Sequence, residues 1–126
     1  MRISHLDHLV LTVAEIEATC NFYQHVLNFE VIEFGENRKA LKFGSQKINL
    51  HQTGHEFEPK AAFPTQGSAD LCFISETPIE HIIQQLKQLH IDIEQGPIQR
   101  NQDERCHRPT CRRIHRQPAR SADRRP

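Results

Sequence analysis

The sequence lacks any apolar run long enough to cross a membrane, and its start lacks the basic-then-apolar pattern of a signal peptide. We therefore expect a protein of the cytoplasm that does not associate with membranes. Cysteine is also scarce, and four cysteines in 126 residues do not indicate a disulfide framework. Cys20 and Cys72 lie in helix-like and strand-like stretches and are predicted to be reduced core residues. The length allows one domain with a single core.

Large aliphatic residues are almost absent from the end of the chain, where Ile114 is the only one after residue 100. Residues 100–126 hold nine arginines against Asp103, Glu104 and Asp123, so this segment carries +6 and the remainder −6. The zero net charge of the chain therefore combines an acidic body with a basic tail. Such a tail cannot supply a core, and residues 101–126 are predicted to be disordered.

This tail also carries two patterns that bear on function. Cys106 and Cys111, with His107 and His115 nearby, have the spacing of a small zinc site, but no apolar framework surrounds them. The arginines could attract nucleic acid through charge alone. Because no aromatic residue is interleaved with them and no folded module is visible, nucleic-acid binding is not expected.

The first fifty residues contain one complete set of predicted elements. Alternation of apolar and polar residues predicts four strands, at residues 6–13, 29–34, 38–43 and 47–52. A helix at about residues 14–26 follows the first strand, and its apolar face carries Ile16, Cys20, Tyr23 and Leu27. The order of strand, helix and three strands forms a βαβββ unit.

A second unit starts after a loop at about residues 53–68, but it is not completed. A strand at 70–74, a helix with Thr77 as its cap and Pro78 in its first turn, and a strand at 91–94 follow in order. The helix is expected to bury the stripe Ile79, Ile82, Ile83, Leu86 and Leu89. Two more strands are due inside the arginine-rich tail, where no apolar strand is visible.

Two explanations account for the missing strands. The first is that everything after about residue 99 or 100 is read in a shifted frame, since suitable codons for Arg113-Ile114-His115 give valine-tyrosine-isoleucine one nucleotide later. The second is a real basic extension on a truncated domain. Both predict an α+β fold of paired βαβββ units, with a domain at residues 1–100 whose second unit is incomplete. Exposed sheet edges would then make the protein poorly soluble.

His8 is the most informative residue, because an imidazole on an otherwise apolar, buried strand needs a hydrogen-bond acceptor or a metal as its partner. Strand alternation collects polar residues on one predicted concave surface, which carries His8, Thr12, Arg38, Lys42, Asn49, His51, Asp70 and Cys72. Two imidazoles and a carboxylate on neighbouring strands suit Fe(II), Mn, Ni or Zn. Arg38 and Lys42 would suit an anionic substrate.

Simpler explanations exist for each of these residues. His8 could be an ordinary hydrogen-bonded histidine. His51 leads into a polar loop and could be solvated, and Asp70 could cap the turn after Gly67 and Ser68. His55 and Glu56, close to His51, could be loop surface or could support a ligand.

Five stretches carry a resemblance to known proteins, namely residues 6–13, 37–44, 47–51, 54–61 and 67–74. They resemble the group of glyoxalase domain-containing protein 5 and its bacterial relatives. Residues 3–100 as a whole resemble the vicinal oxygen chelate superfamily, which includes glyoxalase I, fosfomycin and bleomycin resistance proteins and extradiol dioxygenases. The resemblance ends in the tail, which does not match.

The resemblance implies paired βαβββ units around a divalent metal (Fe, Mn, Ni or Zn), and usually a homodimer whose two chains build each site. By position, His8 matches the first-strand ligand, Asn49 or His51 the last-strand ligand, and Asp70 the first ligand of the second unit. Many relatives have histidine at the position of Asp70, and the usual fourth ligand, a glutamate after an aspartate-proline-aspartate-glycine turn, is absent.

Three functions follow as hypotheses. The first is a metal-dependent lyase, isomerase or dioxygenase, in which the metal chelates two adjacent substrate oxygens and stabilises an oxyanionic intermediate. The second is a metal-free small-molecule binding protein of the bleomycin resistance type. The third is an inactive, frameshifted product.

Overall fold

A computed structural model describes residues 1–97. The tail at 101–126, with its cysteine–histidine motif, therefore lies outside the described residues, as do the two strands expected there. The described residues divide into two compact units, Met1–Ala69 and residues 70–97, and each is presented by itself. No helix within residues 1–97 has both the length and the apolar character needed to span a membrane.

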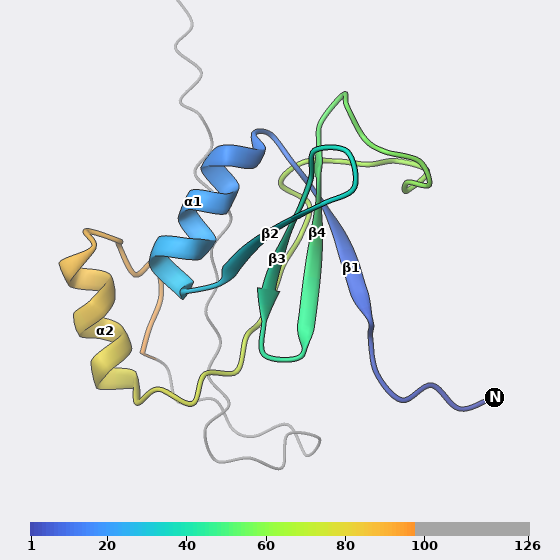
Figure 1. Ribbon diagram of the computed structural model, residues 1–126. Coiled ribbons are helices and arrows are strands. Elements are labelled where there is room, and N and C mark those ends of the chain that lie inside the picture. Colours follow the sequence, from blue (N-terminus) through green and yellow to red (C-terminus); the bar gives the residue numbers. More distant parts are fainter. Residues whose placement is uncertain (98–126) are drawn as a thin grey trace, which may run out of the picture. The chain divides into compact units, whose positions relative to one another are not determined.

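The first unit is the predicted βαβββ unit (Figure 1). Its elements are β1 (His8–Val13), α1 (Ile16–Leu27), β2 (Glu30–Phe34), β3 (Arg38–Phe43) and β4 (Gln46–Gln52). The strands form one sheet in the order β1-β4-β3-β2. β1 runs parallel to β4, while β2, β3 and β4 pair antiparallel through short turns. The α+β class and the four strands expected at residues 6–13, 29–34, 38–43 and 47–52 are thus confirmed.

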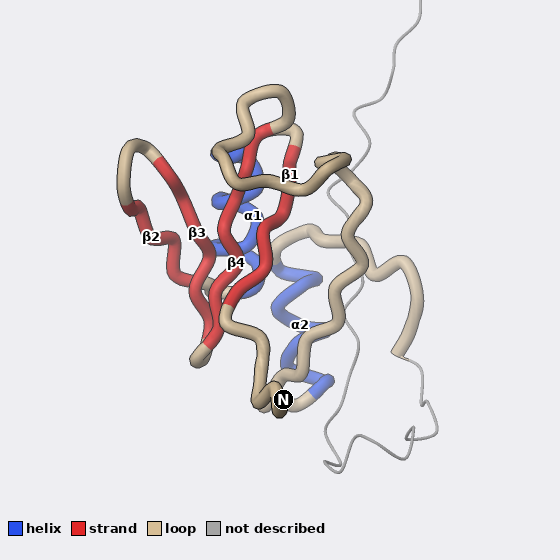
Figure 2. The backbone as a smooth tube through the Cα atoms, turned by 90° about the vertical axis from the view of Figure 1, so that its right-hand side faces the viewer, coloured by secondary structure: helices blue, strands red, loops and turns tan. Residues whose placement is uncertain are grey.

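One face of this sheet forms the core of the unit. Leu41, Ile48 and Leu50 are at most 2 % exposed, and they lie on the side of the sheet that α1 covers, which Figure 2 displays behind the strands. Rings of Tyr23, Phe29 and Phe43 link the helix to the sheet, with centroid distances of 5.4 and 4.3 Å. Burial of this apolar surface is the main favourable contribution to the fold.

Helix α1 has a defined start and a defined end. The Glu15 carboxylate accepts hydrogen bonds from the backbone N–H groups of Glu17 and Ala18, at 2.9 and 2.6 Å, which satisfies two donors of the first turn. At the other end Asn28 adopts a left-handed conformation, with φ 58°, and its N–H donates to the Tyr23 carbonyl. The chain then turns back into β2.

The hairpin between β3 and β4 fixes the register of the site. Gly44 has φ 51°, a conformation that glycine adopts without steric cost, in a turn of two residues. This turn places Phe43 opposite Gln46 and, three pairs along, Ala40 opposite Asn49. A slip of one residue would move every side chain of β4 to the other face.

The second unit contains helix α2 (Ile79–Gln88) and differs from the expectation in several details. Its N-cap is Pro78 without a side-chain hydrogen bond, so the expected cap at Thr77 is not formed. The expected stripe is only half-buried, and Leu89 is 39 % exposed. Cys72, expected in the core, is free and exposed, whereas Cys20 is free and buried as expected.

The strands expected at residues 70–74 and 91–94 are not formed. A strand is defined by backbone hydrogen bonds to a neighbour, so apolar alternation alone does not make one. The described part of the second unit contains no strand with which these segments could pair.

Candidate functional site

The side of the sheet opposite α1 carries most of the predicted site residues, and we call it the polar face. Residues in register on paired strands point to the same side of a sheet, so three rows cross this face. The first row is His8, Lys47, Lys42 and Glu30. The central row is Val10, Asn49, Ala40 and Ile32. The third row combines the pair Thr12 and His51 with the pair Arg38 and Phe34, which come one residue beyond the last β3–β4 pair, Lys39 and Leu50.

His8 lies in the first row, on the edge strand β1. Its side chain is 41 % exposed, so the expectation of a buried imidazole is wrong, since His8 is the first residue of an edge strand. Its Nδ1 lies 2.7 Å from Oδ2 of Asp7, and since a carboxylate only accepts, Nδ1–H is the donor. The same hydrogen bond lowers the pKa of Asp7. Nε2 is therefore the ring nitrogen of His8 that is left without a partner in this hydrogen bond.

The centre of the polar face contains a buried oxygen without a partner. Ala40 is fully buried, and its neighbour in register, Asn49, has an Oδ1 atom that is buried and accepts no hydrogen bond within residues 1–97. A buried acceptor left unpaired costs free energy. Asn49 is two residues along β4 from the level of His8, which corresponds to about 7 Å along the strand. The oxygen is therefore an acceptor whose hydrogen-bonding capacity is unused within residues 1–97.

Three side chains, those of His51, Phe57 and Arg38, lie together at the third row. His51 is 7 % exposed, and its ring meets the ring of Phe57 edge-on at a centroid distance of 5.8 Å. The guanidinium carbon of Arg38 lies 4.4 Å from the centroid of the same Phe57 ring. Phe57 comes from the loop after β4, so this loop folds back over the end of the polar face.

The surroundings of His51 favour its neutral form. Burial is the main cause that lowers its pKa, and the positive charge of Arg38 adds to the effect. Glu56 and Glu58 act in the opposite direction but more weakly. At neutral pH the ring therefore has one N–H donor and one acceptor nitrogen.

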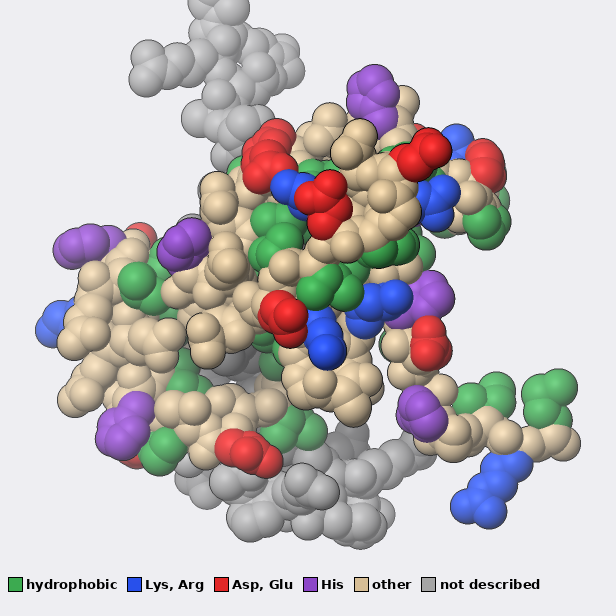
Figure 3. Space-filling view, in the orientation of Figure 1, with side chains coloured by type: hydrophobic (Ala, Val, Ile, Leu, Met, Phe, Trp, Pro, Cys, Tyr) green, Lys and Arg blue, Asp and Glu red, His purple; other side chains and the backbone are tan. Residues whose placement is uncertain are grey.

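The two basic residues predicted to bind substrate are well separated. Arg38 and Lys42 are at opposite ends of β3, about 13 Å apart along the strand. Lys42 is exposed and lies opposite Lys47, whose ammonium lies 5.2 Å from the centroid of the Phe34 ring. Figure 3 shows basic, acidic and histidine side chains close together over the first unit, with apolar surface between them. One small anionic group cannot contact both ends of β3.

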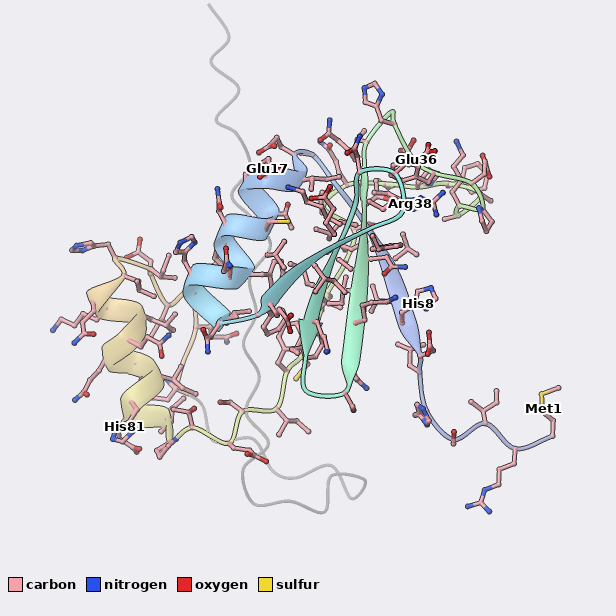
Figure 4. All side chains as sticks on the ribbon, viewed as in Figure 1. Met1, His8, Glu17, Glu36, Arg38 and His81 are labelled. Carbon is pink, nitrogen blue, oxygen red and sulfur yellow. The ribbon has the colours of Figure 1, made fainter. Side chains whose placement is uncertain are left out.

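His8 and His51 also differ in position. His8 is level with Lys47, and His51 with Thr12, so the two imidazoles are about 13 Å apart along the strands. Figure 4 shows His8 on β1 and Arg38 near the turn that contains Glu36. Within residues 1–97 no three His, Cys, Asp or Glu side chains gather closely enough to hold a metal ion. Asp70 is exposed and belongs to the second unit, so its role as a ligand stays a prediction.

Two residues of this site were not identified from the sequence. Asp7 orients His8, and its position directly before that histidine was an available signal. Phe57 organises Arg38 and His51, but an aromatic residue in a polar loop gives no sign of what it contacts. Its role depends on the path of the loop.

Comparison with known proteins gives consistent results. Residues 5–109 match the family described as the Glyoxalase/Bleomycin resistance protein/Dioxygenase superfamily. Virulence protein STM3117 of Salmonella typhimurium strain LT2 is 56 % identical over 100 residues, which are 79 % of this chain and 69 % of that protein. The glyoxalase domain-containing protein RDO1 of Mycosarcoma maydis is 47 % identical over 100 residues, which are 79 % of this chain but only 56 % of RDO1.

Solved structures confirm the fold. The crystal structure of virulence protein STM3117 from Salmonella typhimurium superposes with a TM-score of 0.78 at 54 % identity, over 82 % of each chain. An integron cassette protein from the mobile metagenome of V. cholerae gives a TM-score of 0.77 at 52 % identity, over 82 % of this chain and 80 % of that one. The chain therefore belongs to the glyoxalase/bleomycin resistance protein/dioxygenase superfamily, the vicinal oxygen chelate proteins.

Proposed function

We propose that the polar face binds a divalent metal ion that chelates two neighbouring oxygens of a small-molecule substrate, with His8 and Asn49 as ligands from the first unit. The observation that carries the proposal is the buried Oδ1 atom of Asn49, which lacks a hydrogen bond within residues 1–97. His8 supports it, because its Nδ1–H is bound to Asp7, which leaves Nε2 as the ring nitrogen with a lone pair for a metal.

These two donors fit part of a metal shell. An imidazole nitrogen with oxygen ligands suits Fe, Mn, Ni or Zn, and such an ion needs at least two more donors. Asp70 stays the predicted donor from the second unit, whereas His51 lies about 13 Å from His8 along the strands and is not assigned to this shell. A homodimer would supply the remaining positions.

The bound ion would act as a Lewis acid for charge that develops on the substrate oxygens. The residues of this chain contribute orientation and surroundings. Asp7 accepts a hydrogen bond from the His8 ring, and Ala40 lies in register beside Asn49. Identification of the molecule bound at this face would give the substrate and the type of reaction, whether lyase, isomerase or dioxygenase.

Metal binding by the purified full-length chain tests the proposal without reference to any activity. After treatment with a chelator, the protein is titrated with Zn²⁺, Mn²⁺, Ni²⁺ and Fe²⁺ in a calorimeter, and the stoichiometry is measured by elemental analysis. We expect H8A to lose binding and D7N to weaken it about 10- to 100-fold, because an outer carboxylate orients the ligating ring.

His25 supplies the matched control, since it is an exposed histidine on α1 whose ring bonds to the Asn21 carbonyl. H25A should bind metal as the parent does. If H8A and the parent bind every tested ion equally, His8 is not a ligand. A parent protein that takes up no ion would contradict the proposal and favour a metal-free binding protein.

A further inference from the structure

Arg38 is a cation that forms no ion pair within residues 1–97. Its guanidinium lies against the Phe57 ring, at 4.4 Å from the centroid. Stacking on an aromatic face holds the planar group in one orientation but uses none of its N–H donors. The donors of a half-buried, oriented guanidinium are thus left for another partner.

The acidic residues of the neighbouring loop are already engaged. Glu56 accepts a hydrogen bond from the Gly54 N–H at 3.0 Å, and Glu58 pairs with Lys60 at 3.6 Å. Glu36 lies in the turn before Arg38 and forms no ion pair with it (Figure 4). The described chain therefore does not supply a carboxylate to the guanidinium.

His51 adds a second donor beside Arg38. Its ring is 7 % exposed and packs edge-on against the same Phe57 ring, and it makes no hydrogen bond within the described residues. An imidazole offers an N–H donor in either protonation state. Both polar groups thus lie against one aromatic ring, and neither side chain has an ion-pair or hydrogen-bond partner among residues 1–97.

We propose that Arg38 and His51 form a subsite for the carboxylate group of a small organic acid, with Phe57 as the platform that orients both. A guanidinium has the planar fork that matches a carboxylate. A doubly charged phosphate fits less well, because Glu56 and Glu58 place negative charge close to His51. This inference rests on the proposed function for the location of the remainder of the substrate.

The register then defines the shape of the substrate. The subsite is two residues along β4 from Asn49, about 7 Å away, and Ala40, in register with Asn49, adds no polar atom beside it. The substrate therefore carries its carboxylate at one end and its chelated oxygens at the other. A short apolar segment separates the two ends.

Binding of benzoate to the metal-free, full-length chain tests the subsite, followed by ligand-observed NMR. The R38Q variant should bind benzoate at least about tenfold more weakly, since a charge-assisted, forked contact is lost. K42Q removes a positive charge from the same strand and face at the other end, and it should bind as the parent does. Benzamide, which has the ring without the charge, should not bind.

Two comparisons decide the interpretation. R38K retains the charge without the fork and should bind benzoate more weakly than the parent, and it replaces R38Q if that variant does not melt cooperatively. Equal binding by the parent and the Arg38 variants would overturn the subsite. Inorganic phosphate that binds as tightly as benzoate would overturn the assignment to a carboxylate.

The metal proposal and the carboxylate subsite fail separately in these experiments. H8A should lose metal and retain benzoate, whereas R38Q should lose benzoate and retain metal. Loss of both ligands in both variants would indicate one shared site and would contradict the separation of the two ends.

Discussion

Asn49 combines a cost in stability with a proposed role in binding. Its Oδ1 atom is buried without a hydrogen bond within residues 1–97. In metal-free protein, N49L should therefore raise the free energy of unfolding by about 1 kcal/mol, because leucine has a similar size and needs no partner. Chemical denaturation in the presence of a chelator measures this difference. N21L, at an exposed position of α1, should leave stability unchanged.

The opposite result would remove the basis of the metal proposal. If N49L destabilises the metal-free protein by a similar amount, the amide makes favourable interactions in that state. The Oδ1 atom would then need no ligand as a hydrogen-bond or metal partner. Loss of metal binding together with a gain in stability is the expected combination.

Tyr23 gives a prediction about alkaline pH. Burial raises its pKa above the ordinary value of about 10. The neutral phenol therefore contributes stability that is fully present below the unfolded pKa and is lost as pH rises through the folded pKa. In Y23F this contribution is absent, so the loss of stability above about pH 10 should be smaller.

The measurement is direct, because Tyr23 is the single tyrosine of the sequence and tryptophan is absent. Tyrosinate absorbance therefore reports the ionisation of this one side chain. A titration of the folded protein with an ordinary tyrosine pKa would contradict the prediction.

The N-terminal cap of α1 can be tested at the scale of the element. E15A removes the acceptor for the Glu17 and Ala18 N–H groups and should lower the free energy of unfolding by about 1 kcal/mol. E15S retains a capping oxygen and should recover most of the loss. E36A, in an exposed turn, is the matched control in a denaturation series. Equal stability of E15A and E36A would show that the cap contributes nothing.

The elements were predictable where each had its partner in the same unit. Alternation located β1 to β4, since Leu41, Ile48 and Leu50 pack under α1. The same reasoning failed at residues 70–74, because apolar alternation is a local pattern while a strand needs a neighbour. It also placed the start of α2 at Thr77, because a capping sequence does not require the hydrogen bond to form.

The polar face was predictable to a similar degree. Alternation alone put His8, Asn49, His51 and Arg38 on one side, and the register agrees. The order along that side was not predictable, since it depends on which strands pair and in what register. The exposure of His8 depends on its place at the edge of the sheet, and the position of Phe57 depends on the path of a loop. Neither feature produces a periodic pattern in the sequence.

At the scale of the whole molecule we expect a homodimer. The outer edge of β1 is unpaired within residues 1–97, and exposed apolar side chains lie on this strand (Val10) and on the segment before it (Ile3 and Leu6). Analytical ultracentrifugation should find a dimer for the parent. V10K should shift it to monomer, because a lysine on an edge strand opposes pairing. S45K, in an exposed turn, should remain dimeric, and a monomeric parent would contradict the expectation.

The parallel pairing of β1 with β4 has a consequence for synthesis on the ribosome. β1 leaves the exit tunnel first, yet the strand that pairs with it in the sheet, β4, is made only after α1, β2 and β3. The β2–β3–β4 meander can form through its short turns as it emerges. Pairing of β4 with β1 closes a much longer loop, which carries a larger entropic cost. The nascent His8–Val13 segment thus stays unpaired until Gln52 emerges, and during this interval a chaperone would be able to bind it.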